Sequence, residues 1–218
     1  GKGHGDAIHL TDLCPDRPGL EGMMPHEEKA GGYGWDVHDA TTGEFLCVAT
    51  GDRANGRGLA ADFVPANRGF EFWSSTDADV RDCATGNTVI AGKKPDTNFR
   101  IYWPGDPYDQ TFDGRYSTTT GGYSPRIQNY NTARKSIVTF QNFYEYGNPS
   151  ACNTTKATPC LQADLLGDWR EELIMFQHED DYTSPTCKIM IFSTPEPTKY
   201  KVPCLMEDHV YRMGVVWQ

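Results

Sequence analysis

Short apolar runs, separated by polar turns rich in glycine and proline, follow one another along most of this chain. Within the runs, hydrophobic and polar positions tend to alternate, and no apolar stripe of helical period reaches a convincing length. This pattern is typical of short antiparallel strands joined by turns. We expect strands at residues 7–13, 20–26, 34–38, 45–49, 59–64, 70–74, 88–91, 99–103, 161–166, 172–176, 188–192 and 211–217.

One phrase occurs three times: an aspartate leaves a strand, a turn rich in proline or glycine follows, and an acidic residue opens the next strand. Segment 12–21 aligns with segment 62–71 and, one residue shorter, with segment 164–172. The first two aspartates are 50 residues apart and the next interval is about twice as long, so one unit with a degenerate signature fits between them. A repeat of this length in strand-rich sequence indicates propeller blades.

A second pair of similar segments supports the repeat. Segments 36–43 and 79–86 both begin with Asp-Val and end with Thr-Gly, and each lies between two expected strands. A polar turn that ends in glycine is what a hairpin within a blade requires. We therefore predict an all-β protein, a β-propeller of which this chain supplies about four blades, near residues 1–50, 51–97, 98–150 and 151–218.

The third of these stretches differs from the others. It is dense in Tyr, Thr, Asn and Gly, so we expect a long loop excursion over residues 108–148, where a binding surface could lie. Because a propeller closes only when its last blade meets its first, we also expect a partial ring and a longer protein, with the final apolar run 213–217 forming a strand.

The net charge limits the classes of molecule that the chain could bind. The net charge of -10, from 30 acidic and 20 basic residues, argues against general binding to nucleic acid. An acidic polymer would need a locally positive groove or bound cations. No apolar run approaches the roughly 18 residues of a membrane helix, so we expect no membrane span.

The seven cysteines are too widely spaced for a zinc ribbon, and none forms a CxxC pair. We expect buried thiols, with one or two disulfides, such as Cys152 with Cys160, if the protein is exported. The odd number leaves at least one cysteine unpaired within this chain.

The repeated turns offer several carboxylates within a few residues, as Ca²⁺ with its many oxygen ligands prefers. None of the turns is a complete D-x-D-x-D-G loop, and the alternative is that the carboxylates cap turns and pair with Arg17, Arg68 and Arg170. The candidate Ca²⁺ ligands are Asp6, Asp12, Asp16, Glu21, Asp62, Glu71, Asp164, Asp168 and Glu172.

A basic set precedes the repeated strands. His4, Arg57 and Lys156 each lie a few residues before one of them, and Arg100 lies inside another expected strand. Equivalent positions of successive blades fall on one face of a propeller, so we expect the first three side chains to converge near its axis. The alternative is that they are solvated turn residues.

Several long motifs resemble one known family. They are GKGHGDA (1–7), the segment 12–21, GRGLAAD (56–62), NFRIYWPGD (98–106), KATPCLQADLLGDWREE (156–172) and VYRMGVVWQ (210–218). Together they look like the rhamnogalacturonan lyases of polysaccharide lyase family 11. The similarity runs from end to end, apart from residues 108–148, and its last two motifs are long and specific.

The resemblance implies a secreted, cell-surface or periplasmic eight-bladed propeller that contains Ca²⁺ and cleaves the galacturonate-rhamnose backbone of pectin, an acidic polysaccharide. This chain would be its C-terminal portion, about four blades, with the remaining blades as partners. Carried onto matching positions, the resemblance gives His4, Arg57 and Lys156 as catalytic candidates. It gives Asn153, Thr154 and Thr155 as sugar contacts, to which we add Arg100. The family usually has glycine where this chain has Thr154.

The implied reaction fits these residue types. β-Elimination removes the proton α to the uronate carboxylate and expels the 4-linked sugar, so an enzyme must neutralise that carboxylate and place a base near C5. Arg57 or a Ca²⁺ ion fits the first role. Lys156 or His4 fits the second, and a lysine does so only where positive charge or burial lowers its pKa.

Two further functions remain open on the sequence. The first is a non-catalytic, Ca²⁺-dependent carbohydrate-binding propeller that has lost its chemistry. The second is an adhesion-type calcium propeller that binds protein, which is weaker because it has no need of His4, Arg57 and Lys156 in register.

Overall fold

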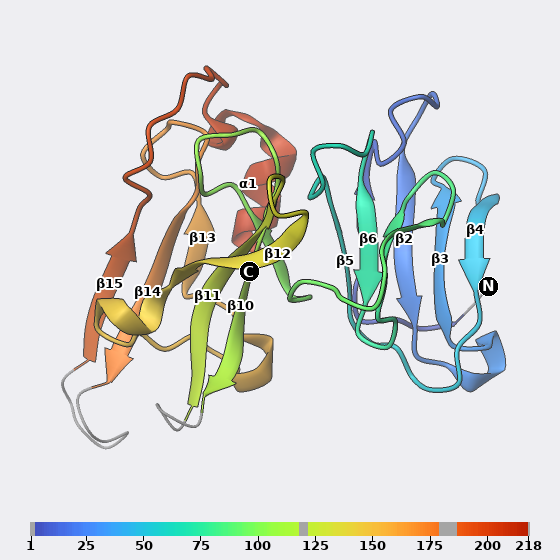
Figure 1. Cartoon of the computed structure of the whole chain (residues 1–218), viewed down its shortest axis with the longest axis horizontal. Helices are drawn as coiled ribbons and strands as arrows, with labels where there is room; N and C mark the ends of the chain where they lie inside the picture. The colour runs from blue at the N-terminus through green and yellow to red at the C-terminus, as the bar shows by residue number, and fades with distance from the viewer. Residues whose placement is uncertain (1–2, 118–121, 179–186, 218) are drawn as a thin grey trace. The chain divides into compact units, whose positions relative to one another are not determined.

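The computed structural model describes residues 3–117, 122–178 and 187–217 (Figure 1). The chain forms two compact units, one of residues 1–100 and 129–138 and the other of residues 101–128 and 139–218. We refer to them as unit 1 and unit 2 and describe each by itself.

Four sheets contain the strands, each built from strands that follow one another in sequence and pair with their neighbours. The first sheet is β1 (His9–Thr11), β2 (Glu21–His26), β3 (Gly34–Asp39) and β4 (Phe45–Ala49). The second is β5 (Gly58–Ala61), β6 (Glu71–Ser74), β7 (Val80–Asp82) and β8 (Thr88–Ile90). The third is β9 (Phe99–Ile101), β10 (Gln110–Ser117), β11 (Gly122–Asn131) and β12 (Ser136–Asn142), and the fourth is β13 (Leu161–Ala163), β14 (Glu172–His178) and β15 (Cys187–Phe192). The prediction of an all-β protein is confirmed, and each sheet falls within one of the four expected stretches.

The repeated phrase forms the connection between the first two strands of a sheet. The acidic residue that opens the second strand is buried, and its carboxylate accepts hydrogen bonds from backbone N–H groups of the turn before it. Glu71 Oε2 accepts from Phe63 (2.9 Å) and Val64 (2.8 Å), and Glu172 Oε2 accepts from Leu165 and Leu166. The buried side chain thus provides an acceptor for backbone N–H groups of the turn.

The degenerate unit expected between the second and last copies also exists. In the third sheet, Gln110 takes the place of the glutamate, and its Oε1 accepts the backbone N–H of Trp103 at 2.9 Å. An amide oxygen therefore makes the same cap as the carboxylate oxygens elsewhere. In the first sheet, Glu21 Oε2 accepts from Cys14 at 3.0 Å.

The similar segments 36–43 and 79–86 form two hairpins that are alike, as predicted. The amide of Gly43 donates to Asp39 O and that of Gly86 to Asp82 O, both at 2.8 Å. Both glycines have positive φ, 73° and 71°, a conformation that other residues adopt only with strain. Each aspartate side chain also accepts backbone N–H groups of its turn, including that of Thr85.

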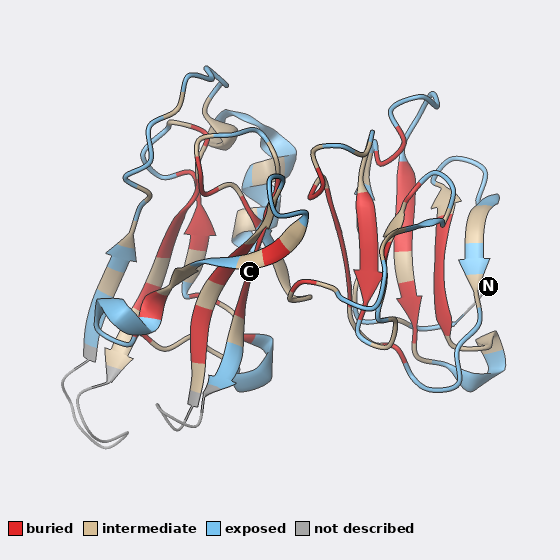
Figure 2. Ribbon diagram, in the orientation of Figure 1, coloured by how far each residue is buried: buried red, intermediate tan, exposed pale blue. Residues whose placement is uncertain are grey.

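Unit 1 is held by two apolar clusters that come from its strands and from the turns that follow them. Figure 2 shows buried residues along β2, β3 and β6. In the first, Trp35 and Phe72 meet edge to face with ring centroids 4.6 Å apart. In the second, Phe63 packs against Trp73 at 5.6 Å. The buried thiols of Cys14 and Cys83 belong to the first cluster. The expectation of buried thiols holds for these two cysteines, whereas Cys47, Cys152 and Cys204 are partly exposed and Cys160 is exposed.

Residues 108–148 do not form the long loop that we expected. They contain the three longest consecutive strands of the third sheet, β10 to β12, of which β10 and β11 pair over seven positions. Each strand carries few apolar side chains, among them the buried Phe112, Ile127 and Ile137, and is polar elsewhere. Apolar and polar residues alternate too rarely here to predict strands. The strands form because pairing satisfies the hydrogen-bonding groups of their backbones.

The expected strand at 211–217 is also wrong, because this segment belongs to the helix α1 (His209–Val216). Asp208 caps the helix by accepting the N–H of Tyr211 at 2.8 Å. The Tyr211 hydroxyl then donates to Glu171 Oε1 at 2.7 Å and accepts the backbone N–H of Asp164, so helix and sheet of unit 2 are joined. Burial is the main cause that raises the pKa of Tyr211, and it keeps the hydroxyl protonated as a donor.

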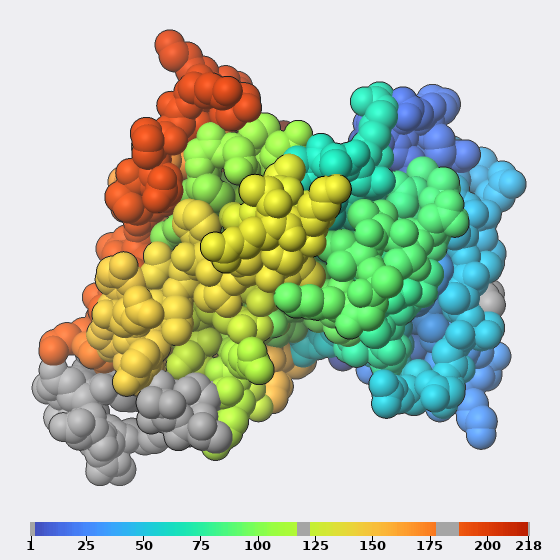
Figure 3. Space-filling view, viewed as in Figure 1, coloured from blue at the N-terminus to red at the C-terminus, as the bar shows by residue number. Residues whose placement is uncertain are grey.

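The fourth sheet has three strands in the described part of the chain, and β15 is its edge. Ile189 and Ile191, two positions apart on β15, are exposed by 75% and 66%. The segment that follows β15 runs over the surface of unit 2 (Figure 3), and it leads to the short 3-10 turn η4 (Leu205–Glu207). The other 3-10 turns are η1 (Lys29–Gly31), η2 (Phe143–Tyr146) and η3 (Thr154–Lys156). None of the helices described is long and apolar enough to cross a bilayer.

Candidate functional site

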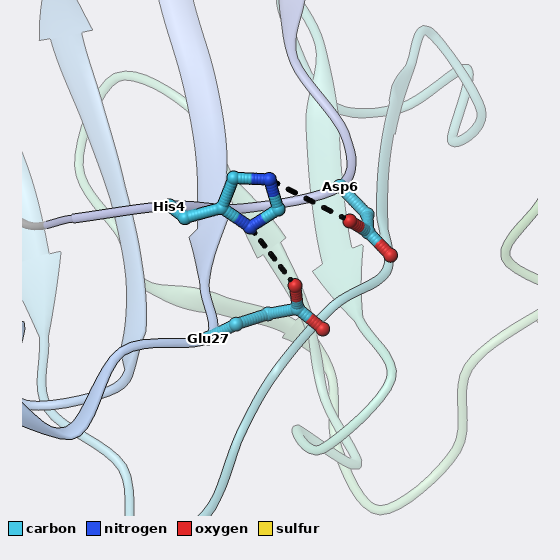
Figure 4. A group of neighbouring side chains, drawn as sticks. All are labelled: His4, Asp6 and Glu27. Atoms are coloured by element: carbon cyan, nitrogen blue, oxygen red, sulfur yellow. Dashed lines mark hydrogen bonds and ion pairs between the residues drawn. The ribbon is translucent and has the colours of Figure 1, made fainter.

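Three side chains of unit 1 meet at the end of β2 where the chain approaches β1 (Figure 4). His4 Nδ1 lies 3.1 Å from Glu27 Oε2, and His4 Nε2 lies 4.0 Å from Asp6 Oδ1. One ligand atom of each residue lies within 4.8 Å of the others. His4 and Asp6 are exposed and Glu27 is partly buried. We refer to His4, Asp6 and Glu27 as the acidic cluster.

The backbone brings the acidic cluster together. The N–H of Glu27 donates to His4 O at 2.8 Å, which continues the pairing of β1 and β2 beyond the strands. Gly56 lies against the same group, because a Cβ on Gly56 would stand 2.3 Å from Glu27 Oε1 and 3.6 Å from Asp6 Oδ2. The loop before β5 therefore borders the acidic cluster.

Arg57 follows Gly56 and is held from both sides. Its Nη1 donates to Asn98 Oδ1 at 2.9 Å, and its backbone O accepts the N–H of Ser75 at 2.8 Å. Asn55, on the other side of Gly56, is fully buried, donates its backbone N–H to His26 O, and uses its side-chain amide to bond Gly34 O at 2.8 Å. This part of the loop is thus fixed to the first sheet just before Arg57.

Arg100, at the second position of β9, lies near His9. The His9 ring contacts Gly58 O at 3.1 Å through Nε2. Burial lowers the pKa of His9, the bond to Gly58 opposes this, and the charge of Arg100 lowers the pKa further. Arg100 is exposed, and its guanidinium lies 5.9 Å from the ring centre of Phe70.

Lys156 ends the turn η3 in unit 2, where Asn153, Thr154 and Thr155 precede it. Asn153 and Thr154 have φ of 60° and 45°, in the left-handed region, and so does Ala157 with 45°. A β-branched residue is rarely found there. A glycine at position 154 would adopt this conformation freely, whereas Thr154 adopts it with strain.

The basic trio is not strictly equivalent in register. His4 and Lys156 both lie eight positions before the repeated aspartate, whereas Arg57 lies five positions before Asp62. His4 and Arg57 belong to unit 1, whose loops place Gly56 beside the acidic cluster, and Lys156 belongs to unit 2. The gathering of all three around one cleft therefore stays a prediction.

Most carboxylates proposed as Ca²⁺ ligands already have partners, either in their own turn or in a neighbouring one. Asp16 forms a bidentate pair with Arg68, and Asp168 pairs with Arg170. Pairing with Arg68 is the largest cause that lowers the pKa of Asp16. Asp164 accepts four backbone N–H groups, from Gly167, Asp168, Trp169 and Leu205.

The remaining candidates vary in exposure. Glu21, Glu71 and Glu172 are the buried caps described above, Asp62 is partly buried, and Asp12 and Asp6 are exposed. Arg17 lies 3.6 Å from Glu21 Oε1. In the repeated turns, these contacts favour turn capping over cation binding.

Sequence reasoning missed Glu27, Asn55 and the buried pair of His26 and Asp36, whose Nε2 and Oδ2 lie 2.6 Å apart. Glu27 does not belong to the repeated phrase, and only the register of β1 on β2 brings it to His4. If β1 and β2 had been aligned residue by residue in an antiparallel pair that starts at Glu21, the alignment would have placed Glu27 near His4.

Replacing Gly56 with alanine should disturb the acidic cluster without unfolding unit 1. The added methyl group would meet the flexible end of Glu27 and displace its carboxylate, which costs little stability. We expect the midpoint of denaturant unfolding to change little, while divalent-cation affinity measured by calorimetry falls about tenfold. Gly214→Ala is the control for an added methyl group that meets no neighbour, because nothing lies within 4 Å of its would-be Cβ and its φ is not positive. Unchanged affinity in Gly56→Ala would show that Glu27 does not hold the cation.

Comparison with known proteins places this geometry in a family. Residues 1–218 match the model described as "Rhamnogalacturonan lyase family 11, C-terminal domain". The chain is 38% identical to rhamnogalacturonan endolyase YesW of Bacillus subtilis, covering 100% of this chain and 32% of YesW. It is 34% identical to rhamnogalacturonan exolyase YesX of the same organism, covering 100% of this chain and 35% of YesX.

The solved structures agree. The crystal structure of YesW superimposes with a TM-score of 0.82 at 38% identity, over 99% of this chain and 33% of that one. The Bacillus licheniformis rhamnogalacturonan lyase gives a TM-score of 0.79 at 36% identity, over 99% and 33%. The chain spans about a third of the length of the curated relatives it matches. It therefore belongs to rhamnogalacturonan lyase family 11, as a match to the C-terminal domain of that family.

Proposed function

We propose that this chain is part of a rhamnogalacturonan lyase that cleaves the galacturonate-rhamnose backbone of pectic rhamnogalacturonan by β-elimination. The observation that carries the proposal is the grouping of the acidic cluster and the Gly56-Arg57 loop in a chain of this family. The related endolyase and exolyase support the same substrate class.

Arg57 is the residue we assign to the uronate carboxylate. Asn98 holds its guanidinium through one nitrogen, which leaves further N–H groups for the bidentate contact that a carboxylate accepts. A fixed cation stabilises the negative charge that develops when the proton α to the carboxylate leaves.

The acidic cluster fits a divalent cation, and we propose Ca²⁺ as the cofactor. Its two carboxylates are hard oxygen donors, and the partly exposed site leaves room for water and sugar oxygens. The imidazole of His4 is a less usual Ca²⁺ ligand. A Ca²⁺ ion held there would add positive charge beside the uronate. In this assignment His4 binds the cation and leaves the role of base to another residue.

Lys156 is that base in our proposal. It is exposed, and within the described part of the chain no carboxylate forms an ion pair with its ammonium group. Its amine takes this role in the neutral form, which requires that bound polymer enclose the exposed side chain and remove it from water. It would then take the proton from C5 of the galacturonate as the C4=C5 double bond forms and the C4–O4 bond breaks, and the departing O4 would take a proton from water. Asn153, Thr154 and Thr155 on the same turn, and Arg100 on β9, are the proposed sugar contacts.

We also propose that the four sheets are blades of an eight-bladed propeller, completed by the remaining blades of a longer, exported protein. The sequential strand order within each sheet and the recurring loop between its first two strands support this architecture. The three-stranded sheet that ends at β15 would accept a further strand.

The decisive experiment incubates the full-length protein with rhamnogalacturonan I and follows the ultraviolet absorbance of the unsaturated uronate. A steady rise supports the lyase. A flat trace with retained binding of the polymer would instead favour a non-catalytic carbohydrate-binding protein. Homogalacturonan serves as the control substrate, because it lacks rhamnose at the cleaved linkage.

Removal of divalent cations should lower both stability and turnover. A ligand that binds only the folded state stabilises it, so chelation with EDTA should lower the melting temperature by about 5 °C. Adding back Ca²⁺ should restore both values, and Glu27→Gln should abolish the difference between chelated and Ca²⁺-loaded protein. If wild-type protein melts at the same temperature with and without chelator, the acidic cluster holds no structural cation.

A further inference from the structure

The loop that carries the proposed base begins and ends with cysteine. Cys152 and Cys160 enclose nine residues, counting both, and their Sγ atoms lie 3.9 Å apart. The Cys160 side chain is exposed and that of Cys152 is partly exposed. We refer to residues 152–160 as the cysteine loop.

Backbone contacts hold the two ends of the cysteine loop together. The N–H of Cys152 donates to Thr158 O at 2.6 Å, and the two residues form an isolated antiparallel bridge. The N–H of Cys160 donates to Ile174 O on β14 at 2.8 Å, and Ser150 just upstream forms a bridge to Phe176 on the same strand. The sulfurs are therefore brought together by contacts that need no covalent bond between them.

A disulfide has an S–S distance of about 2.05 Å, so the sulfurs must approach by rather less than 2 Å. Rotation about the Cα–Cβ bonds of the two side chains supplies a movement of this size, and the exposed position leaves space for it.

The loop between the cysteines is held in an unfavourable conformation. Asn153, Thr154 and Ala157 have positive φ although none is a glycine. Ala157 is fully buried against β10, where a Cβ on Gly114 would stand 2.7 Å from that of Ala157. Strain of this kind persists only where the surroundings fix the chain at both ends.

The cysteines of unit 1 differ from this pair. Burial is the main cause that raises the pKa of Cys14 to about 12 and that of Cys47 to about 11, and it raises the pKa of Cys83 as well. These thiols stay protonated and shielded, so they do not compete for an oxidant.

We propose that Cys152 and Cys160 form a disulfide that closes the cysteine loop into a ring and fixes the turn Thr154–Lys156. Two S–H bonds of the protein and the S–S bond of the oxidant are broken, one S–S bond forms between Cys152 and Cys160, and the two thiol protons end on the sulfurs of the oxidant. The two electrons pass to a low-molecular-weight disulfide such as oxidised glutathione, through a mixed disulfide, and yield two glutathione thiols. The consequence for turnover rests on the proposed function, whereas bond formation and ordering of the loop do not.

The first test is chemical. The full-length protein is equilibrated with oxidised glutathione, its remaining thiols are alkylated, and the peptides are identified by mass spectrometry. We expect one cross-linked species that joins the peptides of Cys152 and Cys160, lighter by about 2 Da than the reduced pair. Recovery of both cysteines in alkylated form from the oxidised sample would overturn the proposal.

The second test measures order directly. In hydrogen exchange, the amides of residues 153–157 should exchange about tenfold more slowly in the oxidised protein than in the reduced one. The double variant Cys152→Ser/Cys160→Ser should match the reduced wild type and ignore the redox buffer. Cys204→Ser should keep the full redox response. Equal exchange in both redox states would show that the bond does not fix the turn.

The third test is turnover on rhamnogalacturonan I. Reduction should lower kcat/KM by about three- to tenfold in wild type and leave the double serine variant unchanged. An active enzyme whose kcat/KM ignores reduction would overturn the link to turnover. A protein that forms the bond and orders its loop but shows no lyase activity in either state would instead refute the proposed function and keep the disulfide.

Discussion

Lys156→Ala is expected to lower kcat for cleavage of rhamnogalacturonan by about three orders of magnitude and to leave affinity for the polymer nearly unchanged. The base acts on the proton only as the transition state forms, so its loss removes little ground-state binding. The side chain is exposed, and η3 depends on backbone contacts such as Lys156 N–H to Asn153 O at 3.0 Å, which alanine retains. Folding should therefore be preserved.

Two further variants separate a base from a mere positive charge. Lys156→Arg keeps the charge but cannot be deprotonated, so it should be as inactive as the alanine variant. Lys201→Ala removes another exposed lysine of unit 2 and should retain wild-type kinetics. Recovery of activity in Lys156→Arg would assign Lys156 to charge stabilisation, and an unchanged kcat in Lys156→Ala would remove it from the site.

Glu71→Ala should cost about 3–5 kcal/mol of unfolding free energy at about pH 5, whereas Glu71→Gln should cost less than about 1 kcal/mol. Alanine leaves the backbone N–H groups of Phe63 and Val64 buried without an acceptor. Glutamine keeps the acceptor, and the chain itself shows this solution at Gln110. Denaturant unfolding at fixed pH measures both values.

The pH dependence of stability provides a second measure of the same residue. Burial is the main cause that raises the pKa of Glu71 to about 8 from its ordinary value of 4.5, although the turn N–H groups oppose it. Between these values the folded protein keeps a proton that the unfolded chain has lost, so stability should fall as pH rises through this window. The loss should be on the order of a few kcal/mol.

Glu71→Gln removes this titration and should flatten the profile, so it should be more stable than wild type above about pH 8. Glu44→Gln, at an exposed position, is the matched control and should leave the profile unchanged. If the Gln variant were as unstable as the Ala variant at low pH, an ionised Glu71 or a bound cation, and not the cap, would be what the turn needs.

The sequence predicted those parts of the fold that depend on local chemistry. The turns that end in Gly43 and Gly86 need a positive φ, and Asp39 and Asp82 bond the turn backbone within a few residues, so their spacing carried the information. The same holds for the buried glutamates, because the turn and its cap are less than ten residues apart.

Elements defined by distant contacts escaped prediction. β10 to β12 are polar strands with few buried apolar residues such as Phe112, and their order comes from pairing with one another. The apolar run at the C-terminal side of Asp208 suited a strand as well as a helix, and the cap at Asp208 and the tether of Tyr211 to Glu171 favour the helix.

The candidate site shows the same division. His4, Asp6 and Arg57 were found from their motifs, but the partners Glu27 and Asn98 were not, because each lies more than 20 residues away and meets its partner only through strand pairing or a loop contact. The role of His4 changed for this reason, from a possible base to a proposed cation ligand.

In the described part of the chain, β15 is an edge strand, and its exposed side chains favour a particular kind of neighbouring strand. Ile189 and Ile191 project from one side of the strand, and within the described residues no strand pairs with its outer edge. A strand that extends the sheet there would be favoured if it placed aliphatic or aromatic side chains on that side. The sheet thus carries a template that selects its own neighbour by shape and hydrophobicity.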